Sequence, residues 1–206
     1  LTDSTVKCWG LSGGGMLGDF EGDRSLEPVA IAGLSGVSKV SVGAVHVCAL
    51  MKTKTVKCWG WNGNYQLGND TVSNSSVPMD VSGLANIDSI SSGFVHTCAI
   101  SESRTKCWGS NGFMQLGIND VSKTWQSASP VEAEGWSGNN DFTSVDANSI
   151  FYSCAVRNVQ PNFLNDSHPQ SDFNSTVYCW GQDENKNPIA PKTSLAYNMP
   201  ILWVKN

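Results

Sequence analysis

The sequence predicts an all-β fold made of β-propeller blades, each of four antiparallel strands, with about three and a half blades in the chain. Cys-Trp-Gly occurs four times, beginning at Cys8, Cys58, Cys107 and Cys179. Between these copies lie short β-branched or aromatic segments of about four to seven residues, bounded by Gly, Pro, Asn and Ser, which is typical of strands. No segment has helical periodicity. Several short strands in each unit of about fifty residues indicate a propeller blade.

The unit boundaries follow from the repeated order of the segments. A glycine-rich turn follows each of the first three Cys-Trp-Gly copies, for example "GWNGNYQLG", and a short apolar stretch with a proline comes next, for example "VPMDVSGL". Because stacked repeats pack on their neighbours, we treat residues 1–206 as a single repeat array. Its predicted parts are a half-blade at 1–34 and blades at 35–84, 85–135 and 136–206, the last with a long insertion at 157–176.

The first and last units differ from the two between them. In 1–34 the sequence predicts only the strands around "TVKCWG" and "EPVAIAGL", so the other two strands of that blade are expected from elsewhere. The last unit keeps Cys-Trp-Gly but lacks the Gln-Leu-Gly turn, and "ILWVKN" is expected to be its final strand. Either the chain is a segment of a longer one, or a neighbouring molecule supplies the missing strands along the open edge.

The cysteines are expected to form one disulfide in each complete unit. Cys48 and Cys58 flank "ALMKTKTVK", which predicts a hairpin turn centred on Thr53, and Cys98 and Cys107 flank "AISESRTK". Each pair then falls at opposed positions of antiparallel strands, at a separation that a disulfide can span. The same logic pairs Cys154 with Cys179. The alternatives are buried free thiols and a metal site, although the close Cys-x-x-Cys spacing of zinc sites is missing.

Cys8 is the seventh cysteine and is expected to be unpaired or to bond to another molecule. By the repeat pattern its partner belongs to the strand that precedes Cys-Trp-Gly in the other units. Four Asn-x-Ser/Thr sequons, at Asn69, Asn74, Asn165 and Asn174, all fall in predicted loops. Sequons and paired cysteines together favour an extracellular setting, secreted or on the cell surface, with N-linked glycans.

Composition excludes several functions. The chain has a net charge of −5 and a pI of about 5.1, and its 13 basic residues form no run, so we expect no nucleic-acid partner. No stretch of about eighteen apolar residues predicts a membrane span. No catalytic constellation, cofactor motif or metal-binding cluster is recognisable. His46 and His96 stand at equivalent repeat positions, where the next unit has Tyr152, so packing with a backbone hydrogen bond is the expected role of both imidazoles.

The series "SVGAVHVCAL…TVKCWGWNGNYQLG" resembles the repeats of the regulator-of-chromosome-condensation family, and the resemblance extends over nearly the whole chain. The match is good around Cys58 and Cys107, looser around Cys8 and weak around Cys179. It implies a β-propeller, usually of seven blades. The disulfide-bearing version looks like those of secreted proteins and of crinkly-type plant receptor ectodomains. The family's guanine-nucleotide exchange on a nuclear GTPase is not carried over, because the chain is acidic and function does not follow from fold.

Two functional hypotheses follow. The first is a non-enzymatic extracellular glycoprotein, a propeller scaffold that associates with other protein chains, copies of itself included, in a larger surface or fibrous structure. The second is a ligand-binding propeller ectodomain of a longer receptor chain. An exchange factor is a third and weaker alternative.

Overall fold

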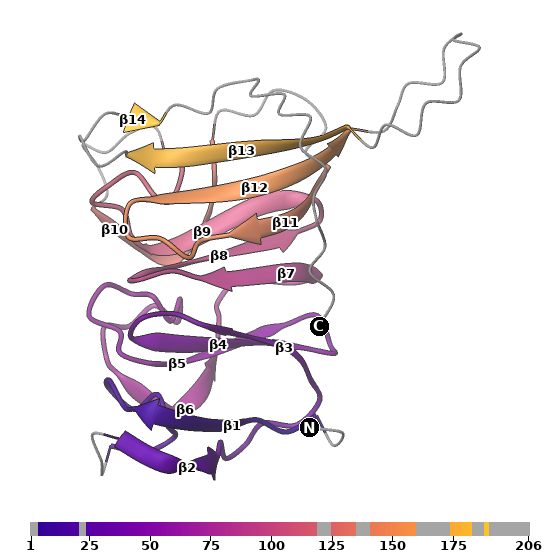
Figure 1. Ribbon diagram of the computed structural model, residues 1–206. Coiled ribbons are helices and arrows are strands. Elements are labelled where there is room, and N and C mark those ends of the chain that lie inside the picture. Colours follow the sequence, from indigo (N-terminus) through magenta and orange to yellow (C-terminus); the bar gives the residue numbers. More distant parts are fainter. Residues whose placement is uncertain are drawn as a thin grey trace, which may run out of the picture.

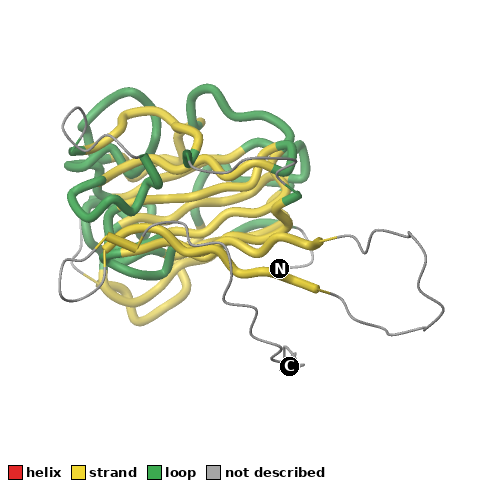
Figure 2. Tube along the Cα trace, turned by 90° about the horizontal axis from the view of Figure 1, so that it is seen from above, coloured by secondary structure: helices red, strands yellow, loops and turns green. Residues whose placement is uncertain are grey.

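The computed structural model describes residues 4–20, 24–118, 125–134, 141–159, 174–182 and 188–189. These residues form strands and loops and include no helix, as Figure 2 shows. In chain order the strands are β1 (Lys7–Leu11), β2 (Arg24–Ala30), β3 (Val37–Val42), β4 (His46–Met51), β5 (Val56–Gly60), β6 (Ser75–Asp80), β7 (Ile87–Ser92), β8 (His96–Ser101), β9 (Arg104–Ser110), β10 (Gln126–Glu132), β11 (Phe142–Asp146), β12 (Tyr152–Val159), β13 (Asn174–Gln182) and β14 (Pro188–Ile189).

The strands form successive antiparallel sheets, one for each sequence unit. β1 and β2 make a two-stranded sheet, and three four-stranded sheets follow in the orders β3-β4-β5-β6, β7-β8-β9-β10 and β11-β12-β13-β14. Neighbours in sequence are neighbours in each sheet, and the sheets lie one after another in Figure 1. The predicted all-β propeller architecture, with a half-blade followed by three blades, is confirmed.

Tight hairpins connect the two middle strands of the second and third sheets. Met51 N–H donates to the Thr55 carbonyl, and Lys54 completes the loop with a φ of 65°. In the next unit Ser101 pairs with Arg104, and the two residues between them, Glu102 and Ser103, have φ values of 51° and 63°. Two successive positive φ angles are those of a type I′ turn, whose twist matches the flanking strands. Both turns lie where the cysteine spacing places them.

The last sheet differs from the sequence prediction in two ways. β12 and β13 continue to the pair Val159–Asn174, so both ends of the predicted insertion 157–176 are strand. Asn174 therefore begins a strand, and its assignment to a loop was wrong. The fourth strand of this sheet, which pairs with the other side of β13, is Pro188–Ile189. The predicted final strand, "ILWVKN", lies outside the described residues, as does Asn165.

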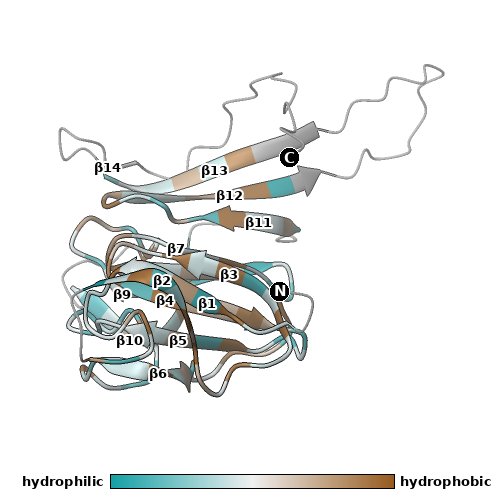
Figure 3. Cartoon of the chain, turned by 60° about the horizontal axis from the view of Figure 1, so that its bottom comes forward, coloured by the Kyte–Doolittle hydropathy of each residue, from teal (hydrophilic) through white to brown (hydrophobic). Residues whose placement is uncertain are grey.

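The hydrophobic cores lie between consecutive sheets. Val6, Met16 and Ile31 of the first unit pack with Val47 and Trp59 of the second. A second core joins Cys58 and Leu67 to Ile90 and Trp108, and a third joins Cys107 and Leu116 to Val145 and Trp180. In Figure 3 the hydrophobic segments fall largely along the strands. The second and third sheets thus each have two buried faces, because their strands alternate side chains between the sheets before and after them.

Candidate functional site: the junction between blades

Each complete unit contains one disulfide at an equivalent position. Cys48 bonds to Cys58, Cys98 to Cys107 and Cys154 to Cys179. The Cα atoms of the three pairs are 4.1, 4.1 and 4.0 Å apart. In an antiparallel pair of strands, opposed residues that exchange no backbone hydrogen bonds have Cα atoms about 4.5 Å apart, closer than hydrogen-bonded pairs. The short Cα distances of the three cysteine pairs fit positions of this first kind. These are the pairs expected from the hairpin register, and they cross-link the two middle strands of each blade.

Removing the Cys98–Cys107 disulfide by a double substitution to alanine is expected to lower the free energy of unfolding by about 2–3 kcal/mol. The bond closes a short loop, with a sequence separation of 9, and the lost cross-link restores entropy to the unfolded chain. Urea unfolding without reductant measures the change. Cys8→Ala is the matched control, because Cys8 is a free thiol. Equal losses in the double variant and the control would contradict the expectation.

A tryptophan follows the second cysteine of each pair and reaches the preceding unit. Each of these indoles donates its Nε1–H to a carbonyl in the preceding glycine-rich turn: Trp59 to Met16 at 2.9 Å, Trp108 to Gln66 at 2.9 Å and Trp180 to Gln115 at 2.8 Å. All three side chains are buried, with exposed fractions of 0, 0 and 2%. Because Cys and Trp alternate on one strand, the disulfide faces the next unit and the indole faces the previous one.

The glycines of the turn are needed where the indole approaches. Gly68 has a φ of +65°, and a Cβ added there would lie 2.7 Å from Nε1 of Trp108. A side chain at this position would be strained by its backbone and would also displace the indole. The Gln-Leu-Gly turn and the Cys-Trp-Gly strand are therefore two halves of one repeated contact, which we call the blade junction.

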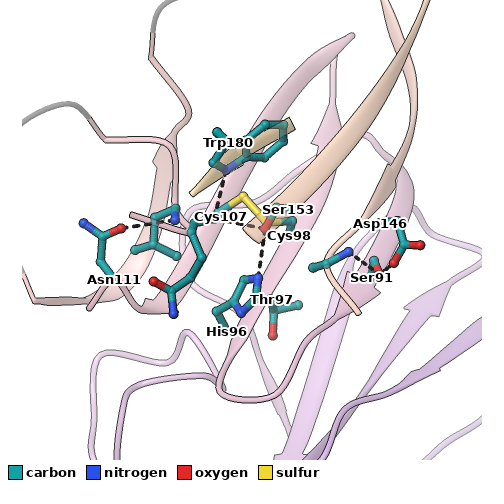
Figure 4. Close-up of a disulfide and its surroundings, with 12 residues drawn as sticks. Ser91, His96, Thr97, Cys98, Cys107, Asn111, Asp146, Ser153 and Trp180 are labelled. Carbon is teal, nitrogen blue, oxygen red and sulfur yellow. Dashed lines mark hydrogen bonds between the residues drawn. A yellow bond between two sulfur atoms is a disulfide. The ribbon is translucent and has the colours of Figure 1, made fainter. Parts of the chain in front are cut away.

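A buried histidine adds a second polar contact to the junction. His46 Nε2 lies 2.7 Å from Thr97 Oγ1 of the next unit, and His96 Nε2 lies 2.8 Å from Ser153 Oγ (Figure 4). The Thr97 hydroxyl donates to the Gln66 carbonyl at 3.1 Å, so the imidazole must donate to the hydroxyl. The sequence reasoning expected a backbone hydrogen bond here and was wrong on that point. Its partner is a side-chain hydroxyl, and the signal was the Thr or Ser directly before Cys98 and Cys154.

Burial keeps both imidazoles neutral. Burial lowers the pKa of His96 to about 4. It also lowers the pKa of His46 to about 3, and electrostatic repulsion from the nearby His96 adds to this lowering. Nδ1 of each ring is buried without a hydrogen-bond partner, so a proton added there has no acceptor. Such rings serve packing and are poorly suited to proton transfer near neutral pH. Among the described residues no group of three or more His, Cys, Asp or Glu side chains is placed to hold a metal ion.

Cys8 occupies the position of Cys58 in the first sheet and is a free, half-buried thiol. Desolvation by burial raises its pKa, which makes the thiolate scarcer. Among the strands that the structure describes, β1 pairs only with β2. Within the described part of the chain, no helix is long and apolar enough to cross a membrane.

Two of the described sequons, at Asn69 and Asn74, begin on the loop between β5 and β6. Asn74 is exposed, and its Oδ1 accepts a hydrogen bond from Asn62 N–H at 2.9 Å. Asn69 is half-buried, and its Oδ1 accepts from Asn62 Nδ2 at 3.1 Å and from Thr71 Oγ1 at 3.0 Å. N-glycosylation uses Nδ2, so both contacts through Oδ1 are compatible with a glycan. The burial of the Asn174 side chain lies outside the described residues.

Three equivalent loops meet at one end of the blades and form a shallow hollow. It has a volume of about 250 Å³ and is lined by residues 42–44, 93–94 and 148–150. Ala44 N–H donates to the Gly93 carbonyl and Phe94 N–H to the Ser149 carbonyl, each at 3.3 Å, so the loops are joined in sequence. Val42, Phe94 and Ile150 expose apolar surface beside it.

The fold and the junctions define the class of protein: an array of β-propeller blades, each complete blade cross-linked by a disulfide. A family model described as "Regulator of chromosome condensation (RCC1) repeat" matches residues 56–100, and a second with the same description matches residues 37–66. Residues 37–100 therefore match RCC1-type repeats, and the chain as a whole is built of β-propeller blades. Among curated protein sequences none matches it.

Solved structures show the same fold. Yeast RCC1 (Prp20), crystallised with Kap60, has a TM-score of 0.71 and 22% identity, over 94% of this chain and 46% of that one. A second structure of Prp20p from Saccharomyces cerevisiae has a TM-score of 0.70 and 22% identity, over 92% and 47%. Human WBSCR16 has a TM-score of 0.67 and 18% identity, over 86% and 47%. The chain thus spans less than half of these proteins, and at such identities the likeness concerns the fold alone.

Proposed function

We propose that the protein is a non-enzymatic extracellular glycoprotein, a propeller scaffold that associates with other protein chains. The observation that carries the proposal is the presence of one cross-strand disulfide in every complete blade. Three such bonds are typical of an oxidising compartment, since the cytosol keeps thiols reduced. The four sequons support the same setting. Asn69 and Asn74, which lie in described loops, accept the hydrogen bonds given above through Oδ1, and a glycan would be attached at Nδ2.

The role in protein association is supported by the family and by the surface. The solved relative Prp20 is bound to Kap60 in one structure, and the other concerns its binding to Gsp1p and histones. In this chain the apolar side chains Val42, Phe94 and Ile150 stand around the hollow between equivalent loops. Interface cores are enriched in such side chains. We propose in addition that the protein self-assembles into a larger surface or fibrous structure.

Mass spectrometry of native material tests the compartment. We expect N-linked glycans on Asn69 or Asn74, removable by peptide N-glycosidase, and the three disulfides intact. Reduced cysteines together with unglycosylated sequons would overturn the extracellular assignment and would favour the alternative of an exchange factor. Sedimentation of the native protein tests self-assembly separately, because a single monomeric species would exclude it without affecting the glycan result.

Asn74→Gln and Ser76→Ala are expected to differ in stability although both remove the same sequon. Asn74→Gln also removes the Oδ1 that accepts from Asn62 N–H, and leaving this donor of the buried Asn62 without its partner costs about 1 kcal/mol. Ser76→Ala leaves that contact in place. We expect both variants to lose one glycan mass, and only Asn74→Gln to lower the urea midpoint clearly. If secreted wild type and both variants have the same mass, Asn74 carries no glycan.

A further inference from the structure

The outer strands of the first three sheets, β2, β6 and β10, all contain the same irregularity. Each has three residues at a place where the strand beside it has one, which makes a β-bulge. The single residue opposite the bulge is the tryptophan of Cys-Trp-Gly. The bulged residues are 26–28 on β2, 76–78 on β6 and 128–130 on β10. Bulges at the edge of a sheet interrupt the ladder of backbone hydrogen bonds.

A serine stands at the start of each bulge and satisfies backbone groups within it. Ser75 Oγ donates to the Val77 carbonyl at 2.7 Å and accepts from the Val77 N–H at 3.2 Å. Ser25 and Ser127 donate to the carbonyl two residues further on in the same way, each at 2.7 Å. A hydroxyl that bonds to the local backbone in this way competes with pairing to another strand.

A proline stands at the end of each bulge and removes a donor from the outer edge. Cys48 and Cys58 form a pair without backbone hydrogen bonds, so Cys58 directs its backbone groups to β6, where it pairs with Met79. Neighbouring residues of a strand direct these groups to opposite sides, so those of Pro78 point outward. Proline has no N–H to offer there. The equivalent prolines are Pro28 on β2 and Pro130 on β10.

Charged side chains occupy the next outward position on two of these strands. By the same alternation, Asp80 of β6 and Glu132 of β10 direct their backbone groups outward. Their carboxylates form ion pairs with Lys57 and Arg104, at 2.8 and 3.1 Å. Charged residues on an edge strand disfavour pairing with a second strand.

The outer edge of β6 also exposes apolar side chains. Among the described strands, β6 pairs only with β5, and β10 pairs only with β9. Val77 and Met79 have exposed fractions of 57 and 41%. An exposed edge strand with apolar side chains is a template for pairing with a strand of another molecule. The serine, the bulge and the proline therefore stand where such pairing would begin.

We infer that these three features form an edge lock, which prevents the outer strands from pairing with those of a second copy of this chain. Association with other chains then uses side-chain surfaces, and the sheets of two molecules do not join edge to edge. The edge lock depends on contacts within a single blade. The inference therefore holds independently of the proposed extracellular setting.

Releasing the edge lock of β10, a strand without a sequon, tests the inference. The double variant Ser127→Ala, Pro130→Val frees backbone groups of Ser129 and restores an outward N–H. Ser129→Val is the matched control, because Val77 occupies the equivalent place on β6 and no N–H is added.

The full chain with its three disulfides intact is compared at increasing protein concentration. The double variant should form aggregates that bind thioflavin T and have the infrared band of intermolecular β-sheet. Wild type and the control variant should show neither signal. A double variant that behaves like the control would overturn the inference.

Hydrogen exchange of the wild-type chain gives a second measurement, which decides the question even if the double variant does not fold. The Glu132 N–H points outward, whereas the Ala133 N–H donates to the Thr105 carbonyl at 3.0 Å. The Glu132 N–H should exchange equally fast in dilute and concentrated solution, and the Ala133 N–H should be protected in both. Protection of the Glu132 N–H in concentrated solution alone would overturn the inference. A single monomeric species in sedimentation would exclude the proposed self-assembly but not the edge lock.

Discussion

Replacing Trp108 by alanine is expected to lower the free energy of unfolding by about 3–5 kcal/mol, the range for truncating a fully buried large aromatic side chain. Trp108 is fully buried in the core between the second and third blades. Its indole also donates to the Gln66 carbonyl and lies against Gly68, so the surrounding backbone cannot collapse easily into the space left behind. The loss should therefore include a cavity term as well as the lost transfer energy.

Urea unfolding of the folded chain measures this effect, and Trp125→Ala is the matched control. Trp125 is largely exposed, and substitutions at exposed positions usually change stability by no more than about 0.5 kcal/mol. A repeat array unfolds in more than one step when its junctions weaken. The urea curve of Trp108→Ala should therefore broaden or split. Equal midpoints for the two variants would mean that the blade junction does not hold the blades together.

Acidification is expected to destabilise the protein through the two buried histidines. Burial lowers the folded-state pKa of His46 to about 3 and that of His96 to about 4, from an ordinary value of 6.5. Below about pH 6.5 the unfolded chain takes up protons that the folded chain cannot accept. Stability is therefore full above this pH and falls as the pH decreases to about 4. Each imidazole contributes a slope of about 1.4 kcal/mol per pH unit in that window.

The urea midpoint between pH 7 and pH 4 measures the loss, and substitution isolates the histidine share. Glutamine can still donate a hydrogen bond to Thr97 or Ser153, but it does not titrate. His46→Gln and His96→Gln should each flatten the pH dependence, and the double variant should flatten it most. Acidic residues also respond to pH, but they do so equally in wild type and variants. A double variant with the wild-type slope would show that these imidazoles do not resist protonation.

Much of the fold was predictable because the sequence repeats itself. Cys-Trp-Gly marks each unit, a glycine-rich turn follows it in the first three, and short β-branched or aromatic segments bounded by Gly, Pro, Asn and Ser identify strands. The pairing of Cys98 with Cys107 follows from hairpin symmetry, since the turn at Glu102 and Ser103 sets which residues are opposed. The last unit was less predictable, because the register of β12 and β13 depends on pairing as far as Asn174, which no local signal marks.

The candidate site was only partly visible in the sequence. His46 and His96 stood out as equivalent positions, but their hydrogen-bond partners belong to the next unit, about fifty residues away. The same holds for Trp59, whose acceptor is the Met16 carbonyl of the preceding turn. Such contacts depend on how one sheet is placed on the next, and local pattern carries no information on that placement.

The sequence by itself therefore determined the repeat, the strands and the opposed cysteines, because each depends on residues close together in the chain. Only the tertiary structure decided which carbonyl receives each indole, why Gly68 must lack a side chain, and that Trp9 lies exposed where Trp59 is buried. The physical reason is that a blade cannot bury both faces within itself. Its second face is completed by a neighbour, and the identity of that neighbour is a property of the assembled array.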